Sequence, residues 1–309
     1  GVLASYKNYM DNLSATPTWG METVRDQAVA AEKYYKNTKN QPNFEVVAGV
    51  NGDFFNMSTG APTGTLVMNG ITYNTNDSWN YFAILDDGSA VIGSGAVPSN
   101  AKEVVGGPAI ILKNGVIDAS SGYGVDQLPR TAVGIKADGS VVFVVADGRQ
   151  APDSCGQTFQ ELAEEMKALG CVDALSLDGG GSATMVSQHE GEEALACVNS
   201  PSDGTERTVS TAILIYSNVA PDGAFDHAVL TPNNEIYTPN STVELAAKGV
   251  DNAGAAADLP VNGEFVLRDE AFGTIEGNVF TSTGKTGSVA VDYVVDGFTK
   301  GSTTFEIQA

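Results

Sequence analysis

The stretch Val172-Asp-Ala-Leu-Ser-Leu177-Asp178-Gly-Gly-Gly-Ser182 joins a short apolar segment to three consecutive glycines. The apolar segment predicts a buried strand, so Asp178 stands at the strand's end. Three adjacent glycines weaken any helix or strand, but they let backbone N–H groups approach a ligand oxygen closely. Because no Gly-Lys-Ser or Gly-Lys-Thr follows, the run is not a nucleotide-binding P-loop. We expect a ligand-binding loop here, with a flexible surface loop as the alternative.

The strand is preceded by a helix and a series of hairpins. Thr158 and Glu161 have the spacing of a capping box, and Gly170 stands where a glycine commonly ends a helix. Dipeptides that tolerate positive φ mark four hairpins, and successive hairpins build antiparallel sheets. These dipeptides lie at 69–70, 87–88, 114–115 and 138–139. The pattern further predicts a helix over 23–36 and strands over 44–50 and 208–216, hence an α+β domain with antiparallel sheets.

A second domain is predicted where the composition changes near residues 216–223. Beyond this point only alternating short strands remain, at 242–245, 264–267, 277–280 and 288–293. We therefore expect one domain over 1–219 and a small all-β Ig-like sandwich over 220–309. In pattern and length this second part resembles the bacterial Ig-like modules that are appended to secreted enzymes.

The chain is strongly acidic, with 16 Lys and Arg against 38 Asp and Glu and a formal net charge of −22. Such a charge disfavours nucleic acids and anionic membranes, so any anionic substrate must be held by a few placed arginines. No run of 18 apolar residues occurs, so no membrane insertion is expected. The first residue is Gly1, which we interpret as a trimmed or mature product. Three cysteines, two histidines and no Cys-x-x-Cys pattern argue against a zinc site, while the disulfide state of the cysteines (Cys155, Cys171 and Cys197) stays open.

Several polar clusters stand at predicted strand ends, where binding and catalytic residues are commonly placed. Each cluster alone fits an ordinary turn or surface charge. They comprise Asn51-Gly-Asp53 with Phe54-Phe55, Gly106-Gly-Pro108, Pro129-Arg130-Thr131, Asp147-Gly-Arg149, Leu177-Asp178-Gly-Gly-Gly-Ser182-Ala-Thr184-Met185 and Asn199-Ser-Pro-Ser-Asp203-Gly-Thr-Glu206-Arg207.

Together these motifs, in this order, resemble the phosphodiester glycosidase family, which includes the mannose 6-phosphate uncovering enzyme. The resemblance covers roughly residues 40–216. It implies an α+β domain whose motifs gather around a surface cavity. It also implies removal of an α-linked N-acetylglucosamine from a phosphodiester, which leaves a sugar phosphate.

Hydrolysis at an anomeric carbon passes through an oxocarbenium-like transition state. The leaving phosphate monoester has a second pKa of about 6, so the reaction needs a phosphate clamp and a carboxylate more than a strong acid. We expect Arg130 and Arg207 to bind the phosphate, helped by the amides of Gly179, Gly180 and Gly181. The expected base or nucleophile is Asp178 or Glu206, with Asp147 in reserve. Asn199 and Thr184 would hold sugar hydroxyls, and the binding set is completed by Asn51, Asp53, Thr131, Arg149, Ser182 and Asp203.

We expect no cofactor and no metal. Asp53, Asp147, Asp178 and Asp203 have oxygen ligands of the kind that divalent cations prefer, but no spacing matches a calcium loop. The expected partner is a glycan or sugar phosphate, with cell-wall association through residues 220–309 and an extracellular or cell-surface location. One rival interpretation is a non-catalytic carbohydrate or cell-wall binding protein. Another is an O-glycosidase or a P–O phosphodiesterase, although the latter commonly uses a metal cluster rich in His and Asp.

Overall fold

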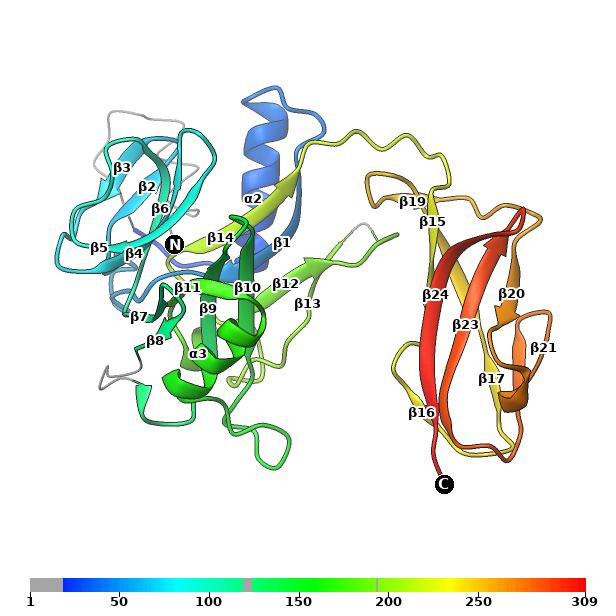
Figure 1. Ribbon diagram of the computed structural model, residues 1–309. Helices are drawn as coiled ribbons and strands as arrows, with labels where there is room; N and C mark the ends of the chain where they lie inside the picture. The colour runs from blue at the N-terminus through cyan, green and yellow to red at the C-terminus, as the bar shows by residue number, and fades with distance from the viewer. Residues whose placement is uncertain (1–18, 119–123, 193) are drawn as a thin grey trace. The chain divides into compact units, whose positions relative to one another are not determined.

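The computed structural model describes residues 19–118, 124–192 and 194–309 (Figure 1). The chain divides into two compact units. The first consists of Gly1–Ser187 and Leu195–Ser217, and the second of Gln188–Ala194 and Asn218–Ala309. None of the described helices combines the length and the apolar character that a membrane crossing requires.

Three sheets form most of the first unit, and their strand pairs run antiparallel, as β1 does with β12 and β14. The first sheet has the order β13-β12-β1-β14, with β1 at Glu45–Asn51, β12 at Met185–Gln188, β13 at Leu195–Cys197 and β14 at Ala212–Ser217. The second has the order β10-β9-β11-β7-β8, with β7 at Ala109–Lys113, β8 at Val116–Ile117, β9 at Arg130–Lys136, β10 at Val141–Ala146 and β11 at Cys171–Ser176. The third has the order β3-β2-β6-β4-β5, with β2 at Leu66–Met68, β3 at Ile71–Asn74, β4 at Asn80–Leu85, β5 at Ala90–Ser94 and β6 at Ala101–Gly107.

All four predicted hairpins are confirmed, as β2–β3, β4–β5, β7–β8 and β9–β10. Asn69 and Gly70 both have positive φ, as a tight two-residue turn between right-twisted strands requires. The hairpins do not join into one sheet. Two belong to the sheet around β4 and two to the sheet around β9.

The described part of the first unit holds two α-helices, α2 at Val24–Asn37 and α3 at Phe159–Ala168. Thr23 caps α2 by accepting a hydrogen bond from the Asp26 amide at 3.1 Å. The predicted capping box of α3 is confirmed, since Thr158 and Glu161 bond each other's backbone amides. Both helices therefore begin within a residue of their predicted start.

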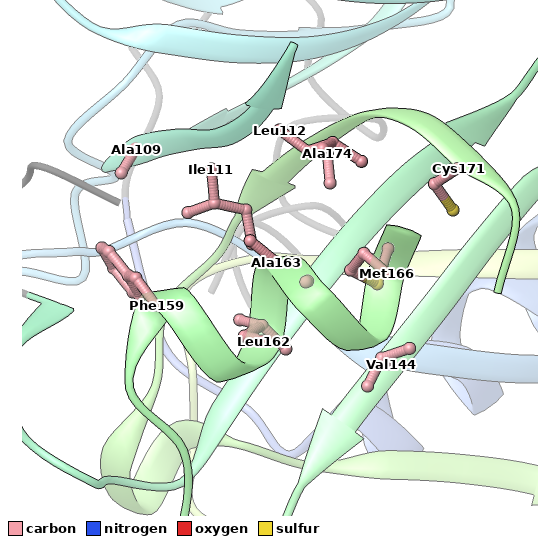
Figure 2. Close-up of a cluster of buried hydrophobic side chains, with 11 residues drawn as sticks. Ala109, Ile111, Leu112, Val144, Phe159, Leu162, Ala163, Met166, Cys171 and Ala174 are labelled. Atoms are coloured by element: carbon pink, nitrogen blue, oxygen red, sulfur yellow. The ribbon is translucent and has the colours of Figure 1, made fainter. Parts of the chain in front are cut away.

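The main core lies between α3 and the sheet around β9 (Figure 2). The apolar face of α3 presents Phe159, Leu162 and Met166, each at most 1% exposed, to β7, β10 and β11. The opposite face of the same sheet presents Val133 and Leu175, which pack against the sheet around β4. Because both faces of β9 and β11 are covered, these two strands form a fixed base for the loops at their ends.

The last strand of the first unit is shorter than predicted. β14 begins at Ala212 rather than near Thr208. Val209 instead pairs with Glu22 in an isolated bridge, and the Ser210 hydroxyl donates to the Gly60 carbonyl at 2.6 Å. These contacts bind the segment before β14 to neighbouring loops and not to a sheet.

The second unit consists of short strands in three small sheets of order β15-β18-β19, β16-β24-β23-β20 and β17-β22-β21. A core that includes Val243, Phe280, Val291 and Phe305 joins β17 and β22 to β23 and β24. Gly277 lies in a turn with φ +63, so the strand expected over 277–280 begins two residues later. The remaining bounds are β15 His227–Thr231, β16 Ile236–Tyr237, β17 Thr242–Glu244, β18 Ala246–Val250, β19 Ala256–Ala257, β20 Glu264–Leu267, β21 Gly273–Glu276, β22 Val279–Ser282, β23 Gly287–Val295 and β24 Phe298–Ile307. The Ig-like assignment stays a prediction.

Candidate functional site

Asn51, at the end of β1, holds two of the predicted motifs together. It is fully buried, and its Nδ2 donates to the Asp178 carbonyl at 2.7 Å. Its Oδ1 accepts from the Thr131 hydroxyl at 2.7 Å and from the Thr184 amide at 3.1 Å. Because every one of these bonds is internal, Asn51 and Thr131 orient the loop after β11 and are not free to bind a substrate.

Asp178 follows β11 as predicted, and its side chain is 92% removed from solvent, with only 8% of the residue exposed. Its Oδ1 accepts from the Gly179 amide at 2.9 Å, and its carboxylate is also bonded by the Ser182 hydroxyl. Burial raises the pKa of Asp178 to about 6, and the nearby charge of Asp53 raises it further while that of Arg207 lowers it. Asp178 is therefore a carboxylate whose protonation changes close to neutral pH.

Asp53 lies beside this group and is 2% exposed. Burial raises its pKa to about 6, against the opposing effect of three hydrogen bonds. The donors are the amides of Phe54 and Gly64 and the Trp79 indole N–H. The structure thus brings two buried carboxylates together, one from the end of β1 and one from the end of β11.

The glycine run forms a single 3-10 turn, η2 at Gly180–Ser182. Two of its amides are used inside the protein, because Gly179 donates to Asp178 and Gly180 donates to the Pro129 carbonyl at 2.9 Å. In this conformation these two amides therefore cannot donate to a ligand oxygen, which is the role we had expected for them. The glycines instead let other groups approach, as the two arginines beside the loop show.

Arg149 places its guanidinium against Gly180. Nη1 and Nη2 lie 3.2 and 3.3 Å from the position that a Cβ on Gly180 would take. Arg149 itself has φ +59, and the other described non-glycine residues with positive φ are all Asn or Asp. Its guanidinium forms no hydrogen bond or ion pair with any residue that the structure describes. Arg149 is therefore an exposed cation in an unfavourable backbone conformation, without a counter-ion among the residues described in this acidic chain.

Arg207 lies against the next glycine. A Cβ on Gly181 would be 2.2 Å from Arg207 Nη2 and 2.3 Å from Asp203 Oδ1. The Nε of Arg207 donates to Asp203 at 2.7 Å, so the two predicted residues form an ion pair within their own turn. Nη2 also lies 2.7 Å from the Asp203 carboxylate, and the charge of Arg207 acts on Asp178.

Arg130 has a different environment from the one we expected. Its Nε donates to the Gln157 carbonyl at 2.9 Å and its Nη2 to the Asp126 carbonyl at 2.8 Å. The guanidinium also stacks on the Phe159 ring, with 4.5 Å from Cζ to the ring centroid. These contacts point the side chain toward the start of α3, so Arg130 connects the β9 entry to that helix.

Asp147 and Asn199 hold the second pair of motifs together. The Asp147 carboxylate accepts from the Ser200 amide at 2.9 Å and from Asn199 Nδ2 at 2.8 Å. Asn199 Oδ1 in turn accepts from the Met185 amide at 2.8 Å. Both polar side chains are thus engaged in positioning the loop at 199–207 against the loop after β11.

Glu206 forms an ion pair with Arg25 of α2. Its other carboxylate oxygen, Oε2, is buried and has no hydrogen-bond partner among the described residues. Thr184 Oγ1 and Ser202 Oγ are in the same state, so three of the four such atoms in the described chain lie in the predicted motifs. Buried polar atoms without partners are rare in proteins, so their occurrence in two of the predicted motifs marks these motifs as candidate binding positions.

No group of three or more His, Cys, Asp or Glu side chains in the described ranges has an arrangement that could hold a metal ion. Each of the four aspartates considered for a cation has partners within the protein. Asp147 accepts from the Ser200 amide, Asp203 pairs with Arg207, Asp53 accepts from three N–H donors, and Asp178 is bonded by the Gly179 amide and the Ser182 hydroxyl. The described cysteines Cys155, Cys171 and Cys197 are all free thiols.

Three residues at the site were not identified from the sequence. Trp79 bonds Asp53, Gly64 lies against the same carboxylate, and Arg25 pairs with Glu206. Trp79 is one of only two tryptophans in the sequence and follows an Asn-Asp-Ser turn, so the sequence did contain a feature that could have identified it. Arg25 lies inside a predicted amphipathic helix, and nothing in its neighbourhood distinguishes it from a surface charge.

Comparison with known proteins agrees with this set of motifs. Residues 44–216 match the family model described as phosphodiester glycosidase. A mouse N-acetylglucosamine-1-phosphodiester alpha-N-acetylglucosaminidase is 29% identical over 160 residues, which are 44% of this chain and 31% of the mouse protein. The SPbeta prophage-derived protein YomE of Bacillus subtilis (strain 168) is 36% identical over 98 residues, which are 31% of this chain and 14% of that protein. The chain therefore covers less than a third of either relative.

The fold agrees as well. The catalytic domain of zebrafish N-acetylglucosamine-1-phosphodiester alpha-N-acetylglucosaminidase, solved in a form auto-inhibited by its pro-peptide, superposes with a TM-score of 0.51 at 23% identity. The match covers 63% of this chain and 67% of that one. Because the family model extends over more than half of its residues, the chain belongs to the phosphodiester glycosidase family.

Proposed function

We propose that the first unit hydrolyses the anomeric C–O bond of a sugar-1-phosphodiester, releasing a free sugar and a phosphomonoester. The observation that carries this proposal is the placement of Asp178, a buried carboxylate with a raised pKa, directly before a glycine run against which Arg149 and Arg207 place their guanidinium groups, with the charge of Arg207 acting on Asp178. The name of the mouse relative suggests α-linked N-acetylglucosamine as the first sugar to test.

The phosphate end of the substrate is assigned to Arg149, assisted by Arg207. A guanidinium without a counter-ion among the described residues can offer two parallel N–H donors to a phosphate, and that of Arg149 lies against Gly180 of the glycine run. Arg207 already shares its charge with Asp203, so it contributes less free charge to the ligand. Arg130 is assigned a structural role, since its donors bond the Gln157 and Asp126 carbonyls and so connect the start of β9 to the segments on either side of it.

The chemical step is assigned to Asp178. A carboxylate with a pKa of about 6 is mostly ionised at pH 7, yet it is a stronger base than an exposed aspartate. It can activate water or attack the anomeric carbon, and the phosphate leaves without strong acid assistance because it is a good leaving group. Glu206 is the second carboxylate in this proposal, because its Oε2 is buried and unpartnered among the described residues.

Ser202 is assigned to a sugar hydroxyl on the same ground as Glu206, since its hydroxyl oxygen is buried and unpartnered in the described chain. Thr184, expected to bind sugar as well, is fully buried and is not presented to a ligand. Asn51, Thr131, Asp147 and Asn199 act by holding the loops in place, because their polar atoms are already bonded within the protein. The second unit is proposed to act as an extracellular Ig-like module that associates with cell-wall glycans, an assignment that rests on its sequence pattern.

The test is a panel of sugar-1-phosphodiesters, including α-N-acetylglucosamine derivatives and teichoic-acid-like fragments, scored for free sugar and phosphomonoester. We expect turnover by the wild type and a loss of about 10²–10³-fold in kcat/KM for Arg149→Gln. Arg149→Lys should recover part of that loss, and Asp138→Asn, in an exposed turn between β9 and β10, is the matched control. Binding of phosphodiesters without any release of sugar would contradict hydrolysis and would favour a non-catalytic carbohydrate-binding protein.

A further inference from the structure

The carboxylate of Asp53 is fully occupied by the protein. Oδ1 accepts from the Phe54 amide at 2.8 Å and from the Trp79 indole N–H at 3.0 Å, while Oδ2 accepts from the Gly64 amide. With 2% of the residue exposed, neither oxygen is presented to a ligand. A substrate-binding role, which the sequence suggested for Asp53, does not fit this environment.

The packing around Asp53 is tight because two glycines allow it. A Cβ added to Gly64 would lie 2.7 Å from Asp53 Oδ2, and one added to Gly106 would lie 2.4 Å from the same atom. Both distances are shorter than side chains tolerate, so the two backbones approach the carboxylate as closely as glycine permits. Asp53 is thereby fixed in position, next to the loop that carries Asp178.

The link between the two aspartates runs through the backbone. The Asp178 amide donates to the Gly52 carbonyl at 2.9 Å, so the residue before Asp53 is bonded directly to Asp178. The charged groups that act on the Asp178 carboxylate are Asp53, from the loop after β1, and Arg207, from the loop before β14. Asp178 also accepts from the Gly179 amide and is bonded by the Ser182 hydroxyl.

The donors differ in a way that decides which carboxylate takes a proton. All three partners of Asp53 are N–H groups, which can donate but cannot accept. A proton on Asp53 would therefore face an N–H and leave that buried donor unpaired, at a cost in free energy. The Ser182 hydroxyl beside Asp178 can rotate and accept, so a protonated Asp178 keeps both of its hydrogen bonds.

We infer that Asp53 is a positioning residue that stays ionised and directs the single proton taken up by the pair onto Asp178. In this arrangement burial makes Asp178 a stronger base than an exposed aspartate, the charge of Asp53 adds to that effect, and the proton returns to Asp178 in every turnover. The inference rests on the proposed function, in which Asp178 is the acting carboxylate. Like charges at close range cannot both ionise freely, so the two carboxylates titrate as a pair.

Two variants should move the acid limb of kcat/KM, measured on a sugar-1-phosphodiester, in opposite directions. Asp53→Asn removes the charge that faces Asp178, so the midpoint should fall by about one pH unit. Trp79→Phe removes one N–H donor from ionised Asp53, so the pair should take up its proton more readily and the midpoint should rise by about half a unit. Trp19→Phe, which removes the other tryptophan, is the matched control and should leave the midpoint unchanged. A purely structural role would lower kcat without moving either midpoint, and shifts in the same direction would overturn the inference.

A readout that does not depend on turnover separates this inference from the proposed function. The gain in unfolding free energy caused by Asp178→Asn should rise between about pH 4 and pH 6 in the wild-type background. In the Asp53→Asn background this rise should level off about one unit lower, so that its midpoint also falls. An unchanged midpoint in the double variant would overturn the inference. Should wild-type protein release no sugar from any phosphodiester while this midpoint still moves, the proposed function fails and the pairing of the two carboxylates stands. Where Asp53→Asn does not fold, Trp79→Phe provides the same titration with the opposite sign.

Discussion

Replacing Asp178 with asparagine should make the first unit more stable at neutral pH and remove its activity. Asparagine fits the site, since its Oδ1 can accept from the Gly179 amide as Asp178 does and its Nδ2 can donate to the Ser182 hydroxyl. The substitution therefore removes a buried charge while the side chain at position 178 keeps both of its hydrogen bonds.

The magnitude follows from the pKa of Asp178, which burial raises from 3.8 to about 6. Each pH unit of such a shift corresponds to about 1.4 kcal/mol, so ionised Asp178 lowers the unfolding free energy by about 3 kcal/mol at pH 7–8. Because the pKa is higher in the folded state, this loss is small below pH 4, develops between about pH 4 and pH 6, and is complete above pH 7. Asp178→Asn should thus add less than about 1 kcal/mol at pH 4 and about 3 kcal/mol at pH 8.

The assay is urea unfolding followed by tryptophan fluorescence between pH 4 and pH 8. The two tryptophans, Trp19 and Trp79, both lie in the first unit, so the signal reports on that unit alone. Asp138→Asn makes the same chemical change in an exposed turn and should show no gain that grows with pH. A destabilised Asp178→Asn protein at pH 8, or a gain equal at every pH, would refute the reasoning.

Three further predictions concern the glycine run, the start of α3 and the role of metal ions. Gly180→Ala should lower the unfolding free energy by about 1–2 kcal/mol in urea unfolding, because Gly180 has φ +62. It should also lower kcat/KM at least tenfold in the sugar-release assay, because Gly180 lies against Arg149. Thr158→Ala should cost about 1 kcal/mol in urea unfolding, because it removes the hydroxyl that accepts from the Glu161 amide, and Thr158→Ser should restore most of it. Dialysis against EDTA should leave sugar release unchanged, since no metal-binding cluster exists among the described residues; a loss restored by a divalent cation would contradict this.

Local elements of the fold were predictable because their signals are local. The capping box at Thr158 and the Asn-Gly turn at Asn69 specify a helix start and a hairpin with few neighbouring residues. The grouping of hairpins into separate sheets was not predictable, because it depends on long-range packing of β9 and β11 between α3 and the sheet around β4.

The candidate site, too, was predictable only in part. Motifs at strand ends do meet, as Asn51 with Asp178 and Asp147 with Ser200 show. The direction of each side chain did not follow from the motif. Arg130 is drawn away from the loop by the Phe159 ring, whose position depends on how α3 packs.

The central claim is that the first unit breaks the bond between the anomeric carbon and oxygen with Asp178 as the acting carboxylate. The most direct measurement is hydrolysis of an α-N-acetylglucosamine-1-phosphodiester in ¹⁸O-labelled water, with wild-type protein and Asp178→Asn side by side. We predict label at C1 of the released sugar for the wild type, and no release by the variant. Label in the phosphomonoester, or equal release by both proteins, would contradict the claim.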